Sequence, residues 1–141
     1  MLDSSRHHVL IVDDDATVRN SLALFLKVSG YEVSTAANGL EALALLKERA
    51  PAVLLSDLNM PEMSGSELLP IVRRQFPTLP IVAMSAGYET RDAIPGGVIA
   101  DAYYAKGRGN LRLLLRVLSV MTGDLAAQAA EDRARSKSVI D

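Results

Sequence analysis

Three continuous apolar runs recur along the chain, and each ends at small or acidic polar residues. They are residues 8–12 (HVLIV), 52–55 (AVLL) and 79–84 (LPIVAM). Runs of this kind are typical of parallel strands that are covered on both faces of a sheet. Residues 31–36 (YEVSTA) and 101–105 (DAYYA) mix apolar and polar positions, as a less buried or edge strand does. The pattern therefore predicts five strands.

Helical periodicity fills the intervals between these strands. From Ala16 the apolar positions recur about every 3.6 residues until Gly30, which supplies a C-terminal stop. Asn38, followed three residues later by Glu41, resembles a capping box and predicts a second helix that ends before Pro51. The apolar stripe expected on this second helix consists of Leu40, Leu43 and Leu46.

A third helix is expected after the second apolar run. Ser64 or Ser66 can cap it, and its apolar positions continue to about Gln75. Pro70 interrupts this segment and removes a backbone donor. We therefore expect either a late start of the helix or a kink near its first turn.

The last two helical intervals differ in quality. Residues 88–100 contain one proline and two glycines, which disfavour helix by about 3 and 1 kcal/mol per residue, so a helix there is predicted to be short or partly melted. Asn110 can cap a final helix over residues 111–121 that Gly123 closes. Its polar stripe is narrow and consists of Arg112, Arg116 and Ser119. We expect the surplus apolar face to be covered by a partner, by a second copy in a homodimer, or by the C-terminal tail.

Five strands that alternate with helices predict an α/β fold in which helices cover both faces of a parallel sheet. The fully apolar strands belong in the middle and the mixed strands at the edges, which gives the flavodoxin-like, doubly wound order 2-1-3-4-5. In that order the first and third strands are neighbours, and ligands bind in the crevice at their carboxyl ends. The acidic residues that follow these strands, Asp13 to Asp15 and Asp57, are therefore expected to meet in one crevice.

Composition narrows the classes of function. The 141 residues suit one domain, and a net charge of −2 without a dense Lys/Arg block argues against nucleic acid or an anionic membrane as a partner. The absence of cysteine excludes disulfides, thiolate nucleophiles and zinc–thiolate sites. The chain begins without a signal-like pattern, and it contains no apolar run of roughly 18 residues. A soluble cytoplasmic protein is the simplest interpretation.

The predicted crevice has the composition of a phosphoryl-binding site. Two carboxylates 4 Å apart repel each other by about 4 kcal/mol at an effective dielectric constant near 20, so a cation must offset them. Mg²⁺ favours sites that combine one or two carboxylates with water and phosphate oxygens. Lys106 adds a positive charge after the fifth strand, and Ser85 adds a hydroxyl donor after the fourth. Asp57 is then placed to act as a nucleophile that forms an aspartyl phosphate.

Each of these residues also has a simpler structural interpretation. The acidic triplet can cap the first helix and complement its dipole, which is the role expected for Asp15. Asp57 alone suits a solvated loop, Lys106 a surface charge, and Ser85 a hydroxyl at a strand end. Tyr103 can be a core residue of an edge strand.

Over residues 7–122 the chain resembles the receiver domain of two-component response regulators, in particular a chemotaxis-regulator-like single-domain receiver. The residues that carry the resemblance stand in order at the expected strand ends. They are Asp13 and Asp14, then Asp57 with Met60, Pro61 and Gly65, then Ser85, and finally Tyr103 and Lys106. Each is a weak signal alone, whereas the ordered set is specific.

The resemblance implies a phosphorylation site. Asp57 would take a phosphoryl group from the phosphohistidine of a sensor histidine kinase or of a histidine phosphotransfer protein. Asp14, Asp57 and the backbone carbonyl of Asn59 would ligate Mg²⁺, while Asp13 would act mainly through a bound water. The protein would take part in phosphorelay and in self-dephosphorylation without being a turnover enzyme.

The resemblance also implies a switch. Lys106 would pair with one phosphoryl oxygen, and Ser85 would move to bond another. Tyr103 would follow Ser85 inward and so change the surface of helix four, strand five and helix five for a downstream protein partner. Gly107 stands where the family usually has proline, so the loop that places Lys106 is expected to differ.

Residues 123–141 are expected to form a tail, either a helical extension or a frayed terminus, without an output domain. Three alternatives stay open. The chain can be a receiver excised from a longer regulator, or a receiver-like binding module that is never phosphorylated. It can also be a phosphatase of the haloacid dehalogenase type, although such enzymes place a second aspartate where this chain has Asn59.

Overall fold

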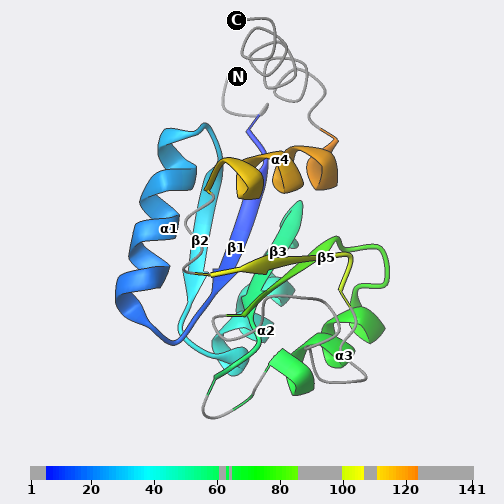
Figure 1. The fold of residues 1–141 in the computed structure, drawn as a ribbon. Coiled ribbons are helices and arrows are strands. Elements are labelled where there is room, and N and C mark those ends of the chain that lie inside the picture. Colours follow the sequence, from blue (N-terminus) through cyan, green and yellow to red (C-terminus); the bar gives the residue numbers. More distant parts are fainter. Residues whose placement is uncertain (1–5, 61–62, 64, 86–99, 107–110, 124–141) are drawn as a thin grey trace, which may run out of the picture.

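The computed structural model describes residues 6–60, 63, 65–85, 100–106 and 111–123. Five parallel strands form one sheet in the order β2-β1-β3-β4-β5, which confirms the predicted order and fold class (Figure 1). The strands are β1 (His8–Val12), β2 (Glu32–Ala36), β3 (Val53–Asp57), β4 (Ile81–Ser85) and β5 (Ala102–Ala105).

Helices cover both faces of this sheet. They are α1 (Ala16–Val28), α2 (Gly39–Glu48), α3 (Gly65–Gln75) and α4 (Leu111–Thr122). The helix expected over residues 88–100 lies outside the described residues, apart from Ala100. Within the described ranges, no helix is both long and apolar enough to cross a bilayer.

The core consists of two layers separated by the sheet. Alternate residues of each central strand point to opposite faces, so Val9 and Ile11 of β1 pack with α1 and α4, while Leu10 and Val12 pack with α2 and α3. All four of these side chains are at most 1% exposed. A strand that is apolar at every position is therefore what a central strand of this sheet requires.

Caps close both ends of α1. Asp15 is the N-cap, as expected, and its Oδ1 accepts hydrogen bonds from two N–H groups of the first turn at 2.9 and 3.2 Å. At the other end Gly30 has a φ of +105°. This left-handed conformation lets the N–H of Tyr31 donate to the carbonyl of Leu26 at 3.0 Å, after which the chain enters β2.

A capping box starts α2, but the buried face differs from the predicted stripe. Asn38 accepts a hydrogen bond from the N–H of Glu41 at 2.9 Å, and the Glu41 carboxylate accepts one from the N–H of Ala37 at 3.0 Å. The residues that pack on the sheet are Ala42, Leu43, Leu45 and Leu46. Leu40 is 62% exposed, so its place in the stripe is wrong. Residues three apart on a helix fall about 60° short of a full turn, so a stripe spaced by threes drifts off the buried face.

Pro70 is accommodated inside α3. The helix begins at Gly65, so the predicted late start is wrong, and Ser66 lies within the helix instead of at its cap. Ser64 lies outside the described residues. An interior proline costs about 3 kcal/mol or more, which apolar burial at about 1.5–3 kcal/mol per side chain offsets. The side chains that α3 buries completely are Leu68, Leu69 and Val72.

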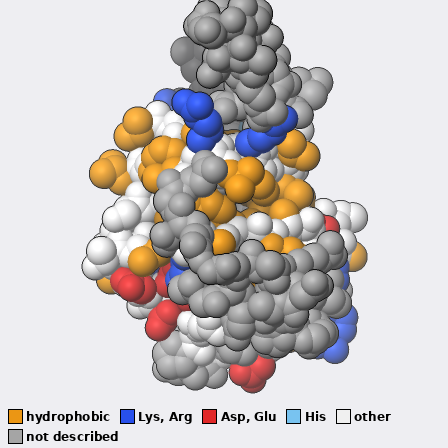
Figure 2. Space-filling view, in the orientation of Figure 1, with side chains coloured by type: hydrophobic (Ala, Val, Ile, Leu, Met, Phe, Trp, Pro, Cys, Tyr) orange, Lys and Arg blue, Asp and Glu red, His pale blue; other side chains and the backbone are white. Residues whose placement is uncertain are grey.

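One face of α4 packs on the sheet and another remains exposed. The sequence places Ser119 in a polar stripe, but Ser119 is buried. Its hydroxyl is satisfied there, because it donates to the carbonyl of Arg116 at 3.1 Å within the helix. Leu113 and Val120 are 47% and 52% exposed. Hydrophobic side chains gather in the upper half of the face drawn in Figure 2, where α4 lies. What covers this face stays a prediction, because the tail lies outside the described residues.

Gly39, the first residue of α2, packs so closely against Met63 that we predict no room for a side chain at this position. A Cβ atom at Gly39 would lie 2.7 Å from the Sδ and 3.0 Å from the Cβ of Met63. We expect Gly39→Ala to lower the free energy of unfolding by about 1–3 kcal/mol in urea denaturation. The same change should cost less in a Met63→Ala background, which removes the Sδ and Cγ atoms and keeps only the Cβ at 3.0 Å. Since alanine otherwise favours helix by roughly 0.5–1 kcal/mol, a stabilising Gly39→Ala would contradict the contact.

Candidate functional site

The carboxyl ends of four strands bring polar side chains to one edge of the sheet. Asp13 follows β1, Asp57 ends β3, Ser85 ends β4 and Lys106 follows β5. The register places Asp57 beside Met84 of β4, so β3 continues two residues beyond the predicted end at position 55. Asp57 is therefore a buried strand residue, 2% exposed, and not the opening residue of a solvated loop.

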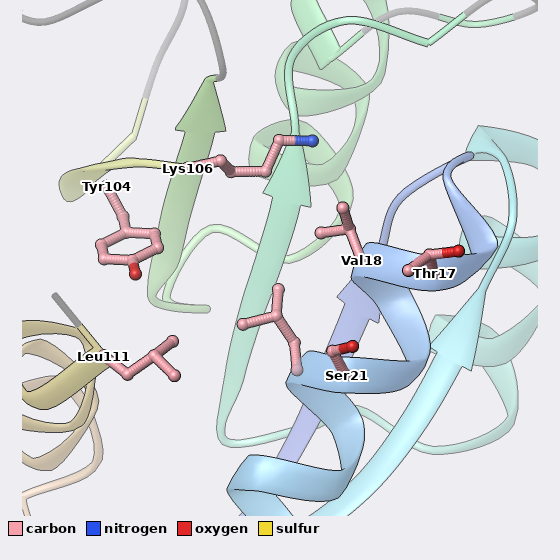
Figure 3. Close-up of a pocket in the computed structure, with 7 residues that line it drawn as sticks. Thr17, Val18, Ser21, Tyr104, Lys106 and Leu111 are labelled. Atoms are coloured by element: carbon pink, nitrogen blue, oxygen red, sulfur yellow. The ribbon is translucent and has the colours of Figure 1, made fainter. Parts of the chain in front are cut away.

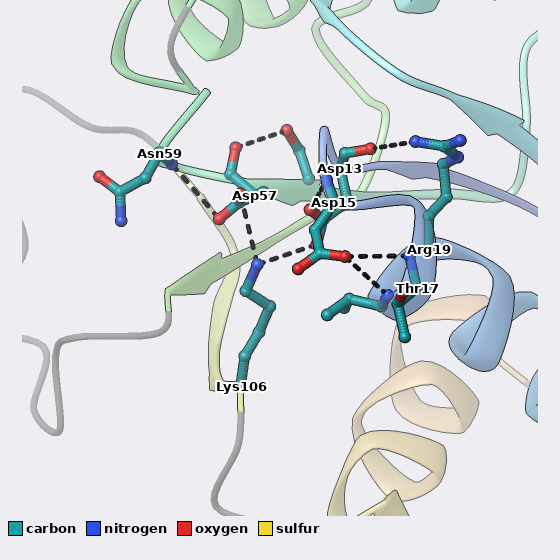
Figure 4. Close-up of polar contacts among 9 residues, drawn as sticks. Asp13, Asp15, Thr17, Arg19, Asp57, Asn59 and Lys106 are labelled. Carbon is teal, nitrogen blue, oxygen red and sulfur yellow. Dashed lines mark hydrogen bonds and ion pairs between the residues drawn. The ribbon is translucent and has the colours of Figure 1, made fainter. Parts of the chain in front are cut away.

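Asp13 is completely buried and is bonded through each of its polar groups. Its N–H donates to the carbonyl of Ala36 at 3.1 Å. Its Oδ1 accepts a hydrogen bond from the N–H of Asp15 at 2.9 Å, and its Oδ2 accepts one from Nζ of Lys106 at 2.9 Å (Figure 4). The carboxylate is thus held in one orientation before any ligand arrives.

Asp57 shares the same lysine. Its Oδ2 lies 3.3 Å from Nζ of Lys106, and its Oδ1 accepts a hydrogen bond from the N–H of Asn59 at 3.3 Å. Burial raises the pKa of Asp57, and the charge of Asp13 raises it further, while Lys106 and the Asn59 N–H oppose the shift without cancelling it. The ionised carboxylate is therefore under-compensated and would gain from a second cation.

Lys106 carries the compensating charge. Burial acts to lower the pKa of Lys106, but its hydrogen bond to Asp13 and the charge of Asp57 outweigh burial, so the net shift is upward. The ammonium therefore remains charged at neutral pH. One ammonium between two buried carboxylates leaves an excess of negative charge at this edge.

Carboxylate oxygens of Asp13, Asp14 and Asp57 lie within 4.8 Å of one another. Asp14 is exposed while the other two are buried, so the cluster opens to solvent on one side. Three hard oxygen ligands with an under-compensated charge fit a divalent ion such as Mg²⁺. In Figure 4 the amide of Asn59 points away from Asp57, so the main chain of Asn59 faces this cluster.

Ser85 and Tyr103, the two residues expected to form a switch, lie on adjacent strands. The Ser85 hydroxyl is buried and has no hydrogen-bond partner in the described part of the chain. A buried hydroxyl without a partner is costly, and an acceptor that enters the site would satisfy it. Tyr103 is half-buried and packs against the core layer of α2 and α3. Residues 86–99 lie outside the described ranges, so the predicted coupling of Ser85 to Tyr103 stays a prediction.

A pocket of about 280 Å³ adjoins the acidic cluster through Lys106 (Figure 3). It lies between α1, β5 and the start of α4. The lining residues are Thr17, Val18, Ser21, Leu22, Tyr104, Lys106 and Leu111. Its walls are mainly apolar, so it contributes no further charge to the site.

The sequence did not predict that Arg19 contacts this site. Its Nη1 donates to the main-chain carbonyl of Asp13 at 2.8 Å. The available signal was its position four residues after the helix cap Asp15, which places it on the same side of the first turn.

Comparison with known proteins gives concordant results. The family model described as "Response regulator receiver domain" matches residues 9–104. The "Probable transcriptional regulator ycf27" of Porphyra purpurea is 34% identical over 121 residues, which are 85% of this chain and 49% of that protein. The transcriptional regulatory protein PrrA of Mycobacterium tuberculosis is 34% identical over 126 residues, covering 87% and 54%. The chain spans about half the length of these curated relatives.

Two solved structures show the same likeness over nearly their whole length. The chemotaxis protein CheY4 of Vibrio cholerae has a TM-score of 0.75 and 34% identity, covering 83% of this chain and 99% of that one. The response regulator protein TrrA of Thermotoga maritima, solved in complex with Mg²⁺-BeF, has a TM-score of 0.71 and 29% identity, covering 80% and 97%.

The raised pKa of Asp57 predicts a pH-dependent gain in stability for Asp57→Asn. The folded protein holds the Asp57 carboxyl at a pKa above its ordinary 3.8. Ionisation of Asp57 therefore destabilises the folded state as the pH rises from the unfolded pKa to the folded pKa. The unfolding free energy of Asp57→Asn minus that of the wild type should grow from about pH 4 upward and then level off. Urea denaturation in metal-free buffer with a chelator measures it. A difference that is constant between pH 3.5 and 7.5 would show that Asp57 ionises without cost.

Proposed function

The chain belongs to the response regulator receiver family, and from this premise we propose that Asp57 is its phosphoacceptor. The observation that carries the proposal is the convergence on Asp57 of Asp13 and Asp14, within 4.8 Å, and of Lys106, at 3.3 Å. Receiver domains of two-component systems are signalling switches that interact with histidine kinases. The phosphoryl donor we propose is the phosphohistidine of such a kinase or of a histidine phosphotransfer protein.

The transfer is a displacement at phosphorus. A carboxylate oxygen of Asp57 forms a bond to phosphorus as the phosphorus–nitrogen bond of the phosphohistidine breaks, and the imidazole keeps the bonding electron pair and takes up a proton. Lys106 is close enough to donate to a phosphoryl oxygen, since it already reaches Asp57 from β5. The unpartnered hydroxyl of Ser85 supports a second donor role for that residue.

Receiver domains bind Mg²⁺ at an acidic pocket, and the acidic cluster of this chain fits that ion. We propose Asp14, Asp57 and the carbonyl of Asn59 as ligands, with Asp13 acting through a bound water. When bound, Mg²⁺ neutralises charge on the phosphoryl oxygens. The buried pair of carboxylates and Lys106 supply the fixed geometry around it.

The output we propose is a changed surface. When Asp57 carries the phosphoryl group, Ser85 and Tyr103 move together, and the surface that combines the predicted helix of residues 88–100 with β5 and α4 changes for a downstream protein. We place the switch in residues 7–122 and treat residues 123–141 as a tail. We also propose a cytoplasmic location, because the donor proteins deliver phosphoryl groups there, and a homodimer through α4 as one form of the partner.

Intact-mass spectrometry tests the proposed phosphoacceptor. Incubation with acetyl phosphate and Mg²⁺ should give a single phosphoryl adduct on the wild type, none on Asp57→Asn, and none when a chelator removes Mg²⁺. A module that is never phosphorylated would give no adduct at all. Rapid release of inorganic phosphate with turnover would instead support the phosphatase of the haloacid dehalogenase type, since self-dephosphorylation also releases phosphate, but at the rate at which the adduct decays.

Lys106→Met separates phosphoryl transfer from metal binding. Loss of one donor to a transferring oxyanion costs about 100-fold in rate, so adduct formation should slow by that order at saturating Mg²⁺. The affinity for Mg²⁺ should be unchanged or higher, because the substitution removes a neighbouring positive charge. Lys27→Met on α1 is the matched control. If Lys106→Met forms the adduct at the wild-type rate, Lys106 has no part in the transfer.

A further inference from the structure

We infer that Arg19 is a positioning residue for the metal site, which aims the carboxylate of Asp14 by fixing the peptide unit between Asp13 and Asp14. This inference rests on the proposed function, because Asp14 matters only as a ligand of Mg²⁺. The contact itself is a hydrogen bond of 2.8 Å from Nη1 of Arg19 to the carbonyl oxygen of Asp13 (Figure 4).

Arg19 is itself held rigidly relative to the acidic turn. It lies in α1, and its own N–H donates to the carbonyl of Asp15 at 2.9 Å. The Asp15 side chain in turn caps the first turn of the helix. Arg19 is half-buried, so its long side chain does not sweep freely through solvent. The guanidinium thus transmits the position of α1 to the turn that precedes it.

Asp14 depends on its backbone for its direction. In the described part of the chain its carboxylate makes no hydrogen bond, whereas Asp13 is bonded at its N–H and at both carboxylate oxygens. The carbonyl of Asp13 and the N–H and Cα of Asp14 belong to one planar peptide unit. A donor that fixes this carbonyl therefore fixes the plane from which the Asp14 side chain projects. Arg19 is the side chain that does so.

The partner of Arg19 separates two roles that this residue could have, positioning of the acidic turn and a simple electrostatic effect on Mg²⁺. Arg19 donates to a carbonyl, and the ion pairs found among the described residues involve Arg49, Arg73 and Lys106 instead. As a bare charge, Arg19 near the cluster would repel Mg²⁺, so its removal would tighten metal binding. As a positioning residue, its removal must weaken metal binding. The two roles therefore predict opposite signs.

The experiment compares Mg²⁺ affinity in the wild type, Arg19→Met and Arg49→Met by isothermal titration calorimetry of the full chain. Loss of a group that orients a metal ligand typically costs about 10- to 100-fold in affinity, so the Kd of Arg19→Met should rise at least tenfold. Arg49→Met removes the same charge from an exposed ion pair with Glu32, the first residue of β2, at the amino ends of the strands. This control should leave the Kd unchanged.

A metal-free readout accompanies the titration. Without Mg²⁺, the N–H of Asp15, which donates to Asp13, should exchange with solvent faster in Arg19→Met than in the wild type, as measured by NMR. Circular dichroism checks that the variant is folded. If Arg19→Met does not fold, Arg19→Gln replaces it, since glutamine is neutral and too short to make the same bond.

The outcomes are distinguishable. A Kd that rises in the Arg19 variant but not in Arg49→Met supports the inference. A Kd that is unchanged or lower in the Arg19 variant overturns it. If the wild type itself binds no Mg²⁺ and forms no phosphoryl adduct, the proposed function fails, and the inference fails with it.

Discussion

The structure depends on one electrostatic constraint, which is that two buried carboxylates share a single ammonium. Lys106 lies 2.9 Å from Asp13 and 3.3 Å from Asp57, and the charge that it leaves uncompensated appears as the raised pKa of Asp57. Burying unpaired charge is expensive, and arrangements of this kind cluster at sites where a ligand completes them. The cation and the phosphoryl group that we propose as ligands of this site would offset that uncompensated charge.

The rest of the fold can be understood as support for that arrangement. The hydrogen-bonded register of the parallel sheet and the two apolar layers that cover it fix the positions of the strand ends relative to one another. The N-cap of α1 and the capping box of α2 then hold the turns that leave β1 and β2. Functional side chains that project from rigid elements are held more accurately than those on free loops, which suits a site where an error of 1 Å changes the chemistry.

Sequence reasoning recovered the strand order, because continuous and mixed polarity report directly on burial at the centre and edge of the sheet. It also recovered the N-caps of α1 and α2, Asp15 and Asn38, because a cap depends on local residue types, whereas the predicted caps Ser64 and Asn110 lie outside the described residues. It failed for Leu40 and Ser119, where the orientation of a helix on the sheet decides burial. It also ended β3 too early, because a polar residue at a strand end resembles a loop until the neighbouring strand is known. The contact of Arg19 was not predicted, because its partner is a main-chain carbonyl, which every residue type has and which the sequence therefore does not mark.

The order of the site residues along the chain determines when each one becomes available during synthesis. Its carboxylates come from positions 13, 14 and 57, but its cation comes from position 106, beyond the last and shortest strand. A nascent chain that ends after β4 contains all three carboxylates but still lacks the lysine. The shared ammonium therefore reaches the carboxylates only when β5 has docked beside β4. A product truncated before β5 carries the acidic residues without the ammonium that they share.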